Sequence, residues 1–456
     1  MKAVAKKSVL SGHITVPGSK SHTIRALILA AMADGTSHIS NPLPSNDCLS
    51  TAAAVRKIGA EVDFGDGQEA AVWTVRGAGS ALHLPAEPVD VGNSGSLMYF
   101  LCPVLSTLDG ECTFTGDESI CRRPVNHLID ALCQFGANAR SLNSESGGTT
   151  PPFCFCGPID VNKTLVTEGT LSQYISGFMM AASRLNGTLK MELTNPKETP
   201  YLTMTKLWLE SVGVPVTISP DFKHVEVTGP VPFKAFDRAV PSDWEGVAFP
   251  LIAALISGSE IVIDNVDGSG SQGDDKIVEV LQSVGADIEW RREEEQLVVR
   301  GGKRLSTKTL PDGKLYVDMS SFPDAICALA VAACFTEGEV VFTDIDICRK
   351  KETDRIKAMV SELTKLGAKL EDKGDCLVVY GRGGAAGCDT SVCGAGLHGG
   401  EVESYKDHRI VMSLACLGLG LPEGERVIVK DAEWCSVTFP HFFEVMNKLG
   451  AGFETI

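Results

Sequence analysis

Two short segments of the chain place several cations and carboxylates immediately before an apolar, helix-like run. The segment RKKETDR, residues 349 to 355, holds four cations and two carboxylates and is followed by IKAMVSELTKLGA. The segment SYKDHRIVMSLACLG, residues 404 to 418, repeats the arrangement with a histidine. Cations and the free amides at a helix start attract negative charge, so the pattern is typical of an anion-binding site. It is also typical of a solvated, capped helix face.

Three further segments have more polar and basic character than their apolar surroundings explain. They are GSKSHTIRALILAA (18 to 31), GNSGSLMYF (92 to 100) and SICRRPVNHLIDAL (119 to 132). The GNSGS turn matches neither the phosphate-loop spacing nor GxGxxG, so we interpret it as a turn with several exposed amides. In three of the five segments the basic residues come directly before an apolar, helix-like run, which would direct cations and backbone amides at one point, as in an anion-binding site.

Composition excludes several classes of protein. The 456 residues are 44% hydrophobic and 22% charged, which predicts a globular protein with more than one core. A formal net charge of −17 argues against nucleic-acid and anionic-membrane partners, so anions must be captured by local basic clusters. The chain has no signal-like apolar segment and no run near the roughly 18 apolar residues of a membrane span, so we expect a cytoplasmic protein. The 15 cysteines are scattered, which favours buried free thiols over a zinc site or disulfides.

One pattern recurs along the whole chain: an apolar-periodic helix, then Gly followed by Ala or Val, then a short strand-like run. Successive copies are 77, 77, 72, 82 and 83 residues apart, and their glycines are Gly59, Gly136, Gly213, Gly285, Gly367 and Gly450. A glycine just after a helix takes a positive φ and lets the chain turn directly into a strand. The spacing predicts six helix-and-strand units.

Units of this length predict an α/β (α+β) fold, and six of them exceed the size of one domain. We therefore expect two lobes with three repeats each, separated near the segment FKAFDRAVPSDWEG, which has the Pro, Asp and Gly of a linker. The predicted domains are residues 19-239 and a discontinuous domain of residues 1-18 plus 240-456. We expect the active site in the cleft between them.

The segments together resemble a known family. The motifs SKSHTIRA, VGNSGS, RRPVNHLIDAL, LSQ, PYLTMT, SFPDA, KKETDRIKAM, YKDHRI and TFPHFFEV occur in the order found in the enolpyruvyl transferases, and most closely in the EPSP synthase family. The resemblance implies two domains, each with three βαβαββ repeats in an inside-out barrel. It implies transfer of the enolpyruvyl group from phosphoenolpyruvate to the 5-hydroxyl of shikimate 3-phosphate, in the shikimate pathway of aromatic amino acid biosynthesis. It implies no metal or organic cofactor, small-molecule substrates as the partners, and a monomer.

The same resemblance assigns roles to individual residues. The catalytic residues would be Lys20, Asp324, Glu352 and His408. Phosphoenolpyruvate would be bound by Lys20, Gly95, Arg123, Gln173, Arg355 and Arg409. The acceptor would be bound by Ser21, Arg25, Ser172, Tyr201, Asp324 and Lys351. Asp324 would be the base at the acceptor hydroxyl, and Glu352 the acid and base at the phosphoenolpyruvate methylene. Asp354 and Asp407 would orient the adjacent arginines.

Several positions depart from the family pattern. Leu171 and Glu198 stand where the family holds the acceptor phosphate with serines, and a carboxylate is a poor phosphate ligand. Val437 and Tyr99 replace basic residues, and Lys406 is a candidate to restore one lost charge. One alternative is therefore an enolpyruvyl transferase for a carboxylate-bearing acceptor that lacks the 3-phosphate. A second is a non-catalytic binding protein of the same fold, although the proton-transfer residues are all present.

Overall fold

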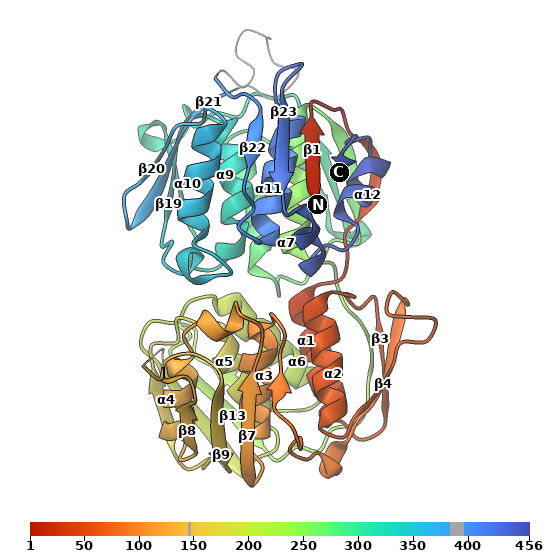
Figure 1. Cartoon of the computed structure of the whole chain (residues 1–456), viewed down its shortest axis with the longest axis vertical. Helices are drawn as coiled ribbons and strands as arrows, with labels where there is room; N and C mark the ends of the chain where they lie inside the picture. The colour runs from red at the N-terminus through yellow and green to blue at the C-terminus, as the bar shows by residue number, and fades with distance from the viewer. Residues whose placement is uncertain (145–146, 384–395) are drawn as a thin grey trace. The chain divides into compact units, whose positions relative to one another are not determined.

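The computed structural model describes residues 1–144, 147–383 and 396–456, and it divides into two compact units. Unit 1 consists of Met1–Pro17 and Ser242–Ile456, and unit 2 consists of Gly18–Pro241. The chain therefore begins in unit 1, builds unit 2 and returns, so that both termini lie in the same unit (Figure 1).

The described residues of unit 2 form three four-stranded sheets. In each sheet the first two strands are parallel and the remaining pairs are antiparallel. In spatial order the sheets are β14 (Asp237–Ala239), β3 (Thr36–Ser40), β5 (Val72–Arg76) and β4 (Glu61–Asp63); β6 (Val89–Asp90), β7 (Gly110–Thr115), β9 (Phe153–Gly157) and β8 (Asn138–Ser141); and β10 (Thr164–Thr167), β11 (Gly187–Leu193), β13 (His224–Gly229) and β12 (Val216–Ile218).

The described residues of unit 1 repeat this design, again with one parallel pair in each sheet. The sheets are β2 (Ser11–Thr15), β15 (Glu260–Asp264), β17 (Gln296–Arg300) and β16 (Asp287–Arg291); β18 (Lys314–Asp318), β19 (Glu337–Thr343), β21 (Cys376–Arg382) and β20 (Leu370–Asp372); and β22 (Gly400–Val402), β23 (Arg426–Lys430), β1 (Lys2–Lys6) and β24 (Glu454–Thr455).

Each sheet belongs to one βαβαββ repeat, so the predicted mixed fold of six repeats is confirmed. Three repeats are completed by a strand from far along the sequence. In unit 2, β14 pairs with β3, and in unit 1, β2 pairs with β15 and β1 with β24. None of the sheets formed by the described residues closes into a barrel.

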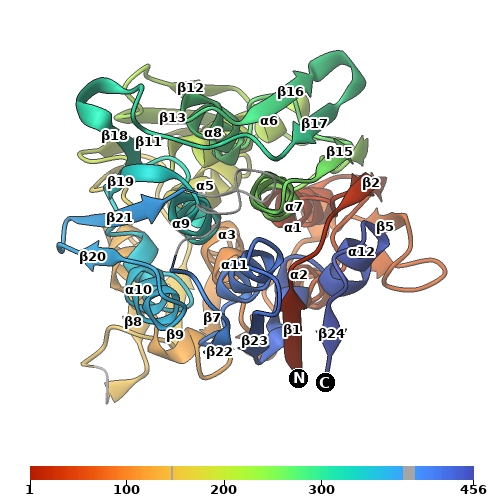
Figure 2. The same ribbon diagram turned by 90° about the horizontal axis from the view of Figure 1, so that it is seen from above.

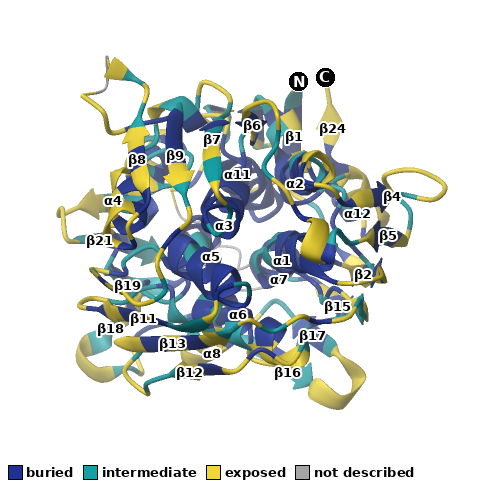
Figure 3. Cartoon of the chain, turned by 90° about the horizontal axis from the view of Figure 1, so that it is seen from below, coloured by how far each residue is buried: buried dark blue, intermediate teal, exposed yellow. Residues whose placement is uncertain are grey.

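The helices of each unit fall into two classes. The inner helices are apolar all round and almost wholly buried, as expected for helices with no solvent face: α1 (Lys20–Met32), α3 (Gly95–Leu105), α5 (Ser172–Ala182), α7 (Trp244–Ser257), α9 (Ile326–Cys334) and α11 (His408–Leu419). The outer helices keep one exposed face: α2 (Asn46–Lys57), α4 (Asn126–Gln134), α6 (Thr199–Ser211), α8 (Ile277–Ser283), α10 (Arg355–Lys365) and α12 (Phe442–Lys448). Figure 2 shows α7, α9 and α11 enclosed by the sheets of unit 1, and Figure 3 shows the burial of α1, α3 and α5. In this sense each unit has its helices on the inside.

The predicted glycine turns are confirmed at all six positions. Each outer helix ends two residues before its glycine, and the glycine φ values lie between 86° and 109°. Such angles strain any residue with a Cβ, so glycine is the natural residue there. The strand that follows is the edge strand of its sheet: β4, β8, β12, β16, β20 or β24.

Two expectations from composition also have structural outcomes. In residues 1–144, 147–383 and 396–456, no helix has the length and apolarity needed to cross a membrane. The cysteines in these ranges are free thiols, and most are buried. Cys388 and Cys393 lie outside the described residues.

Candidate functional site

The predicted site residues of unit 1 gather around the carboxylate of Asp324, just before α9. Lys351 Nζ lies 2.9 Å from Asp324 Oδ2, and Arg355 Nη1 lies 2.5 Å from Oδ1. Burial alone would raise the pKa of Asp324. The Lys351 and Arg355 cations outweigh that effect, so the pKa of Asp324 lies well below its usual value. Asp324 is therefore ionised at neutral pH, held between two cations.

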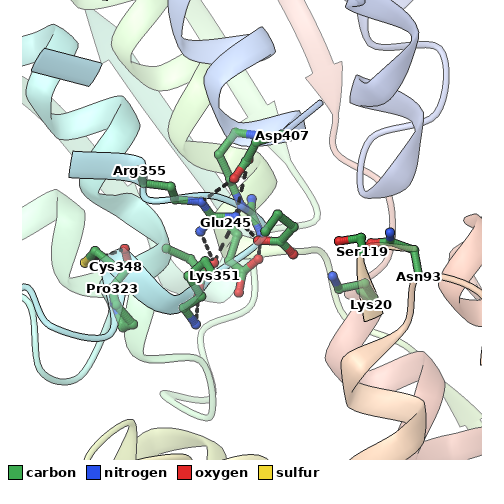
Figure 4. Close-up of polar contacts among 12 residues, drawn as sticks. Lys20, Asn93, Ser119, Glu245, Pro323, Cys348, Lys351, Arg355 and Asp407 are labelled. Atoms are coloured by element: carbon green, nitrogen blue, oxygen red, sulfur yellow. Dashed lines mark hydrogen bonds and ion pairs between the residues drawn. The ribbon is translucent and has the colours of Figure 1, made fainter. Parts of the chain in front are cut away.

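Arg355, the first residue of α10, connects Asp324 to two further carboxylates. Its Nη2 donates to Glu352 Oε2 at 2.6 Å and its Nε donates to Asp407 Oδ2 at 2.8 Å. The side chain is fully buried, and although burial lowers its pKa, the three carboxylates raise it well above the usual value. Arg355 thus stays charged and is fixed in orientation by groups from three segments of unit 1 (Figure 4).

The prediction that Asp354 and Asp407 orient their adjacent arginines was wrong in its pairing. Asp354 caps α10 by accepting from the Lys357 amide, and it lies 3.7 Å from Arg349 rather than on Arg355. Asp407 accepts the backbone N–H of Arg409, while its carboxylate holds the guanidinium of Arg355 from the start of α11. The aspartate that orients Arg355 therefore lies on a different helix.

Arg409 is held by a residue that the sequence did not predict. Its Nη2 pairs with Glu245 in the first turn of α7, and its Nε lies 3.9 Å from Asp324 Oδ1. His408 is buried beside it as the first residue of α11. The unit 1 cluster therefore brings together Asp324, Lys351, Glu352, Arg355 and Arg409, with His408 adjacent in sequence to Arg409.

Replacement of Lys351 by methionine is expected to raise the pKa of Asp324. The reason is that Lys351 is one of two cations that lower this pKa, and methionine keeps most of the side-chain volume. The carboxyl titration is measured by NMR in protein carrying ¹³C-labelled aspartate. Lys350→Met, at an exposed neighbouring position, is the control and should leave the titration unchanged. An unshifted Asp324 titration in Lys351→Met would contradict the ion-pair network.

Lys20 and Arg123 are two of the predicted phosphoenolpyruvate-binding residues of unit 2. Lys20, the first residue of α1, lies 3.3 Å from the carboxylate of Asp47. Arg123 Nη2 donates to Asn93 Oδ1 and to Ser119 Oγ, both at 3.1 Å. Figure 4 draws Lys20, Asn93 and Ser119 in one view. The Nε atom of Arg123 is buried without an acceptor among the described residues, so this guanidinium retains a donor for a ligand.

Gly95, the first residue of α3, lies against the same arginine. A Cβ placed on Gly95 would be 3.4 Å from Arg123 Nη1, which is about van der Waals contact distance. Gln173 on α5 donates to Ser96 Oγ at 3.1 Å. Tyr99, which stands in place of a family arginine, is buried and donates to the Pro124 carbonyl at 3.2 Å. The starts of α3 and α5 therefore meet beside Arg123.

Arg25 on α1 is a buried cation surrounded by neutral oxygens. Its guanidinium donates to Thr205 Oγ1 at 2.8 Å, and the other partners are the Ser21 carbonyl at 3.0 Å and Ser176 Oγ and the Tyr201 carbonyl at 3.3 Å. Burial lowers its pKa below the usual value, yet a guanidinium remains protonated near neutral pH. Four of its five N–H groups are used, so one Nη1 donor is left among the described contacts. This is a fitting place for a carboxylate ligand.

The predicted acceptor residue Ser172 already contacts a carboxylate of the chain itself. Glu198 Oε2 accepts from the Ser172 backbone N–H at 3.3 Å and from its Oγ at 3.1 Å. Glu198 is 3% exposed and has a left-handed backbone with φ of 51°. Ser172 is the first residue of α5, so the Glu198 carboxylate lies at the positive end of the helix dipole. Where the resemblance implies the acceptor phosphate, the structure has the Glu198 side chain.

Sequence reasoning missed four residues that hold the predicted cations: Asp47, Asn93, Ser119 and Glu245. Asn93 and Ser119 lie inside segments that had been singled out, but only as parts of a turn and a basic run. Glu245 lies in the predicted linker, directly after its Pro-Ser-Asp-Trp stretch. Asp47 gave no signal, because nothing near it in sequence marks its contact with α1.

Comparisons with known proteins agree with this arrangement. The family model described as EPSP synthase (3-phosphoshikimate 1-carboxyvinyltransferase) matches residues 4–446. A protein of Ruminiclostridium cellulolyticum named 3-phosphoshikimate 1-carboxyvinyltransferase is 35% identical over 451 residues, covering 99% of each chain.

Two solved structures are similar over nearly the whole chain. The EPSP synthase of Acinetobacter baumannii superposes with a TM-score of 0.80 at 26% identity and covers 100% of both chains. The enolpyruvyl transferase NikO from Streptomyces tendae has a TM-score of 0.76 at 17% identity, covering 99% of this chain and 98% of its own, and it shares the fold. With a family match along almost the entire sequence and close relatives of equal length, the chain belongs to the EPSP synthase (3-phosphoshikimate 1-carboxyvinyltransferase) family.

Proposed function

We propose that the chain transfers the enolpyruvyl group of phosphoenolpyruvate to the 5-hydroxyl of shikimate 3-phosphate, with release of phosphate. The family match supports a transferase of this kind. The observation that carries the proposal is the cluster around Asp324, where Lys351 and Arg355 hold one carboxylate and Arg355 also binds Glu352. It supplies cations for an anionic substrate and two carboxylates for proton transfer.

The proposed reaction needs three proton transfers at two atoms: the acceptor hydroxyl loses a proton, and C3 of phosphoenolpyruvate gains one and later loses one. The acceptor oxygen bonds to C2 of phosphoenolpyruvate while C3 takes up a proton, which gives a tetrahedral intermediate. The C2–O bond to phosphate then breaks as C3 loses a proton, which restores the double bond and releases phosphate. We assign Asp324 to the hydroxyl proton and Glu352 to the methylene proton, with Lys20 and His408 as further catalytic groups.

Substrate binding would change the basicity of Asp324. In the unliganded cluster, Lys351 and Arg355 are neutralised by the carboxylates around them. The phosphate and carboxylate of phosphoenolpyruvate would compete for the same cations. The pKa of Asp324 would then rise from its lowered value, so that it accepts the hydroxyl proton more readily.

The groups proposed to bind phosphoenolpyruvate are divided between the units. Lys20, Gly95, Arg123 and Gln173 belong to unit 2, and Arg355 and Arg409 belong to unit 1.

A second candidate is transfer to a carboxylate-bearing acceptor that lacks the 3-phosphate. The observation that favours it is the Glu198 carboxylate on Ser172. A carboxylate accepts a hydrogen bond from a hydroxyl well but repels a phosphate. Arg25 would bind the acceptor carboxylate whether or not the acceptor carries the 3-phosphate.

Identification of the product tests the main proposal. Purified protein is incubated with phosphoenolpyruvate and shikimate 3-phosphate, and ³¹P NMR follows both phosphates. We expect inorganic phosphate and a new phosphorylated enol ether to appear in equal amounts, and neither to appear without the acceptor. Phosphate with no ether product, or no consumption of phosphoenolpyruvate, would overturn the proposal. If phosphoenolpyruvate is bound but not consumed, the chain would instead be a non-catalytic binding protein of the same fold.

The cytoplasmic location expected from the sequence and the monomer implied by the family resemblance are further parts of the proposal. Sedimentation of the purified protein tests the second of these directly, since a mass of 48.5 kDa is expected for the monomer.

A further inference from the structure

The segment between β22 and α11 has an unusual backbone directly before the site. Tyr405 and Lys406 are consecutive non-glycine residues with φ of 55° and 57°. Left-handed angles are uncommon for such residues and persist only where the surroundings hold them in place. Asp407, which grips Arg355, follows at once and is fully buried. Whatever holds this turn therefore also sets the position of Asp407.

The turn has local bonds, in which Ser404 accepts from the amides of Lys406 at 3.2 Å and Asp407 at 3.0 Å. The group that fastens it to α10 is the buried carboxylate of Glu362. Its side chain is 0% exposed. Glu362 accepts from the Glu403 backbone N–H at 3.0 Å and from the Tyr405 hydroxyl at 2.7 Å. Lys365 donates to it at 2.8 Å and Ser361 at 3.0 Å. Burial raises the pKa of Glu362, but Lys365, the Glu403 amide and Tyr405 lower it below the usual value, so the group is a carboxylate at neutral pH.

The spacing on α10 shows how the two contacts work together. Arg355 and Glu362 are seven residues apart, about two helical turns, so they project from the same face of the helix. Arg355 meets Asp407 at one end of the 403–407 turn, and Glu362 meets Glu403 and Tyr405 at the other. The turn is thus fastened to α10 at both ends.

We propose that Glu362 and Tyr405 are positioning residues, which hold the 403–407 turn so that Asp407 keeps Arg355 oriented for its anionic ligand. They touch no substrate in this account and act through Asp407 and Arg355. The ligand part of the proposal rests on the proposed function, because phosphoenolpyruvate is the ligand assigned to Arg355.

Tyr405→Phe is the test variant, because it removes one hydrogen bond to the Glu362 carboxylate and leaves the other donors in place. Tyr380→Phe is the matched control: its hydroxyl also donates to a glutamate, at 2.8 Å, but this residue is the exposed Glu371 on the edge strand β20. Each protein is analysed by amide hydrogen exchange without ligand, and by calorimetric titration with phosphoenolpyruvate.

We expect faster exchange in Tyr405→Phe confined to residues 403–409, and phosphoenolpyruvate affinity weaker by about tenfold, the usual effect of losing a hydrogen bond to a buried charge. Affinity for shikimate 3-phosphate alone should change less than twofold, and Tyr380→Phe should match the wild type in every measurement. Unchanged exchange at 403–409, exchange raised equally throughout unit 1, or unchanged phosphoenolpyruvate affinity would overturn the proposal. If the wild type itself does not bind phosphoenolpyruvate, the proposed function fails, and the exchange result alone decides whether Glu362 and Tyr405 hold the turn.

Discussion

Replacement of Glu352 by glutamine is expected to lower kcat by about 10²- to 10⁴-fold, the range typical of a lost general acid or base. Glutamine keeps the shape of the side chain and a hydrogen-bond acceptor for Arg355, which Glu352 now meets at 2.6 Å. It removes the ability to exchange a proton with the methylene carbon. One negative charge beside Arg355 is also lost, so affinity for phosphoenolpyruvate should be unchanged or slightly higher. Steady-state rates and calorimetric titration measure the two effects separately.

The control for this variant is Glu339→Gln on β19. Glu339 also pairs with a cation, Lys314, at 2.7 Å, but it is partly exposed and lies outside the Asp324 cluster. It should retain the wild-type kcat. A Glu352→Gln enzyme with turnover within threefold of the wild type would remove Glu352 from the chemistry.

Neutralising Glu198 is expected to lower the KM for shikimate 3-phosphate by as much as about a thousandfold. A phosphate near Ser172 would face the Glu198 carboxylate, and two unit charges about 4 Å apart repel by about 4 kcal/mol at an effective dielectric near 20. Glu198→Gln keeps the size of the side chain, and Glu198→Asn shortens it with a residue that tolerates the left-handed backbone. The KM for phosphoenolpyruvate should change little in both, because the groups proposed to bind it do not include Ser172.

Glu210→Gln is the matched control. Glu210 lies on α6, farther along the chain than Glu198, and pairs with Lys206 on the exposed face of the helix. It should leave both KM values unchanged. If neither Glu198 variant alters the KM for shikimate 3-phosphate, the carboxylate does not face the phosphate when the acceptor binds. A variant that instead acquires activity with shikimate 3-phosphate, absent in the wild type, would favour the unphosphorylated acceptor.

The repeat architecture was predictable because its signals are local. Each outer helix is followed, two residues after its end, by a glycine with a positive φ, and this local pattern revealed all six copies in the sequence. The strands that complete three of the repeats from far along the sequence were not predictable in detail. The pairing of β1 with β24 joins the two ends of the chain, and no short-range pattern announces a partner so far away.

The site shows the same division between local and long-range information. The resemblance named Asp324, Lys351, Glu352 and Arg355 as a set, and the structure brings these four side chains into contact. The partners that orient the cations were harder to find. Glu245 meets Arg409 from a different helix, and such contacts depend on packing rather than on sequence neighbours. Glu198 was recognised as unusual, but only the structure gives its contact with Ser172.

The proposed acceptor is tested most directly by the rate of phosphate release from phosphoenolpyruvate by the wild-type protein with shikimate 3-phosphate, with shikimate, and with no acceptor. We expect release only with the phosphorylated acceptor, at a KM raised by Glu198. Release with shikimate in preference, or without any acceptor, would contradict it and would show that Leu171 and Glu198 mark a changed acceptor.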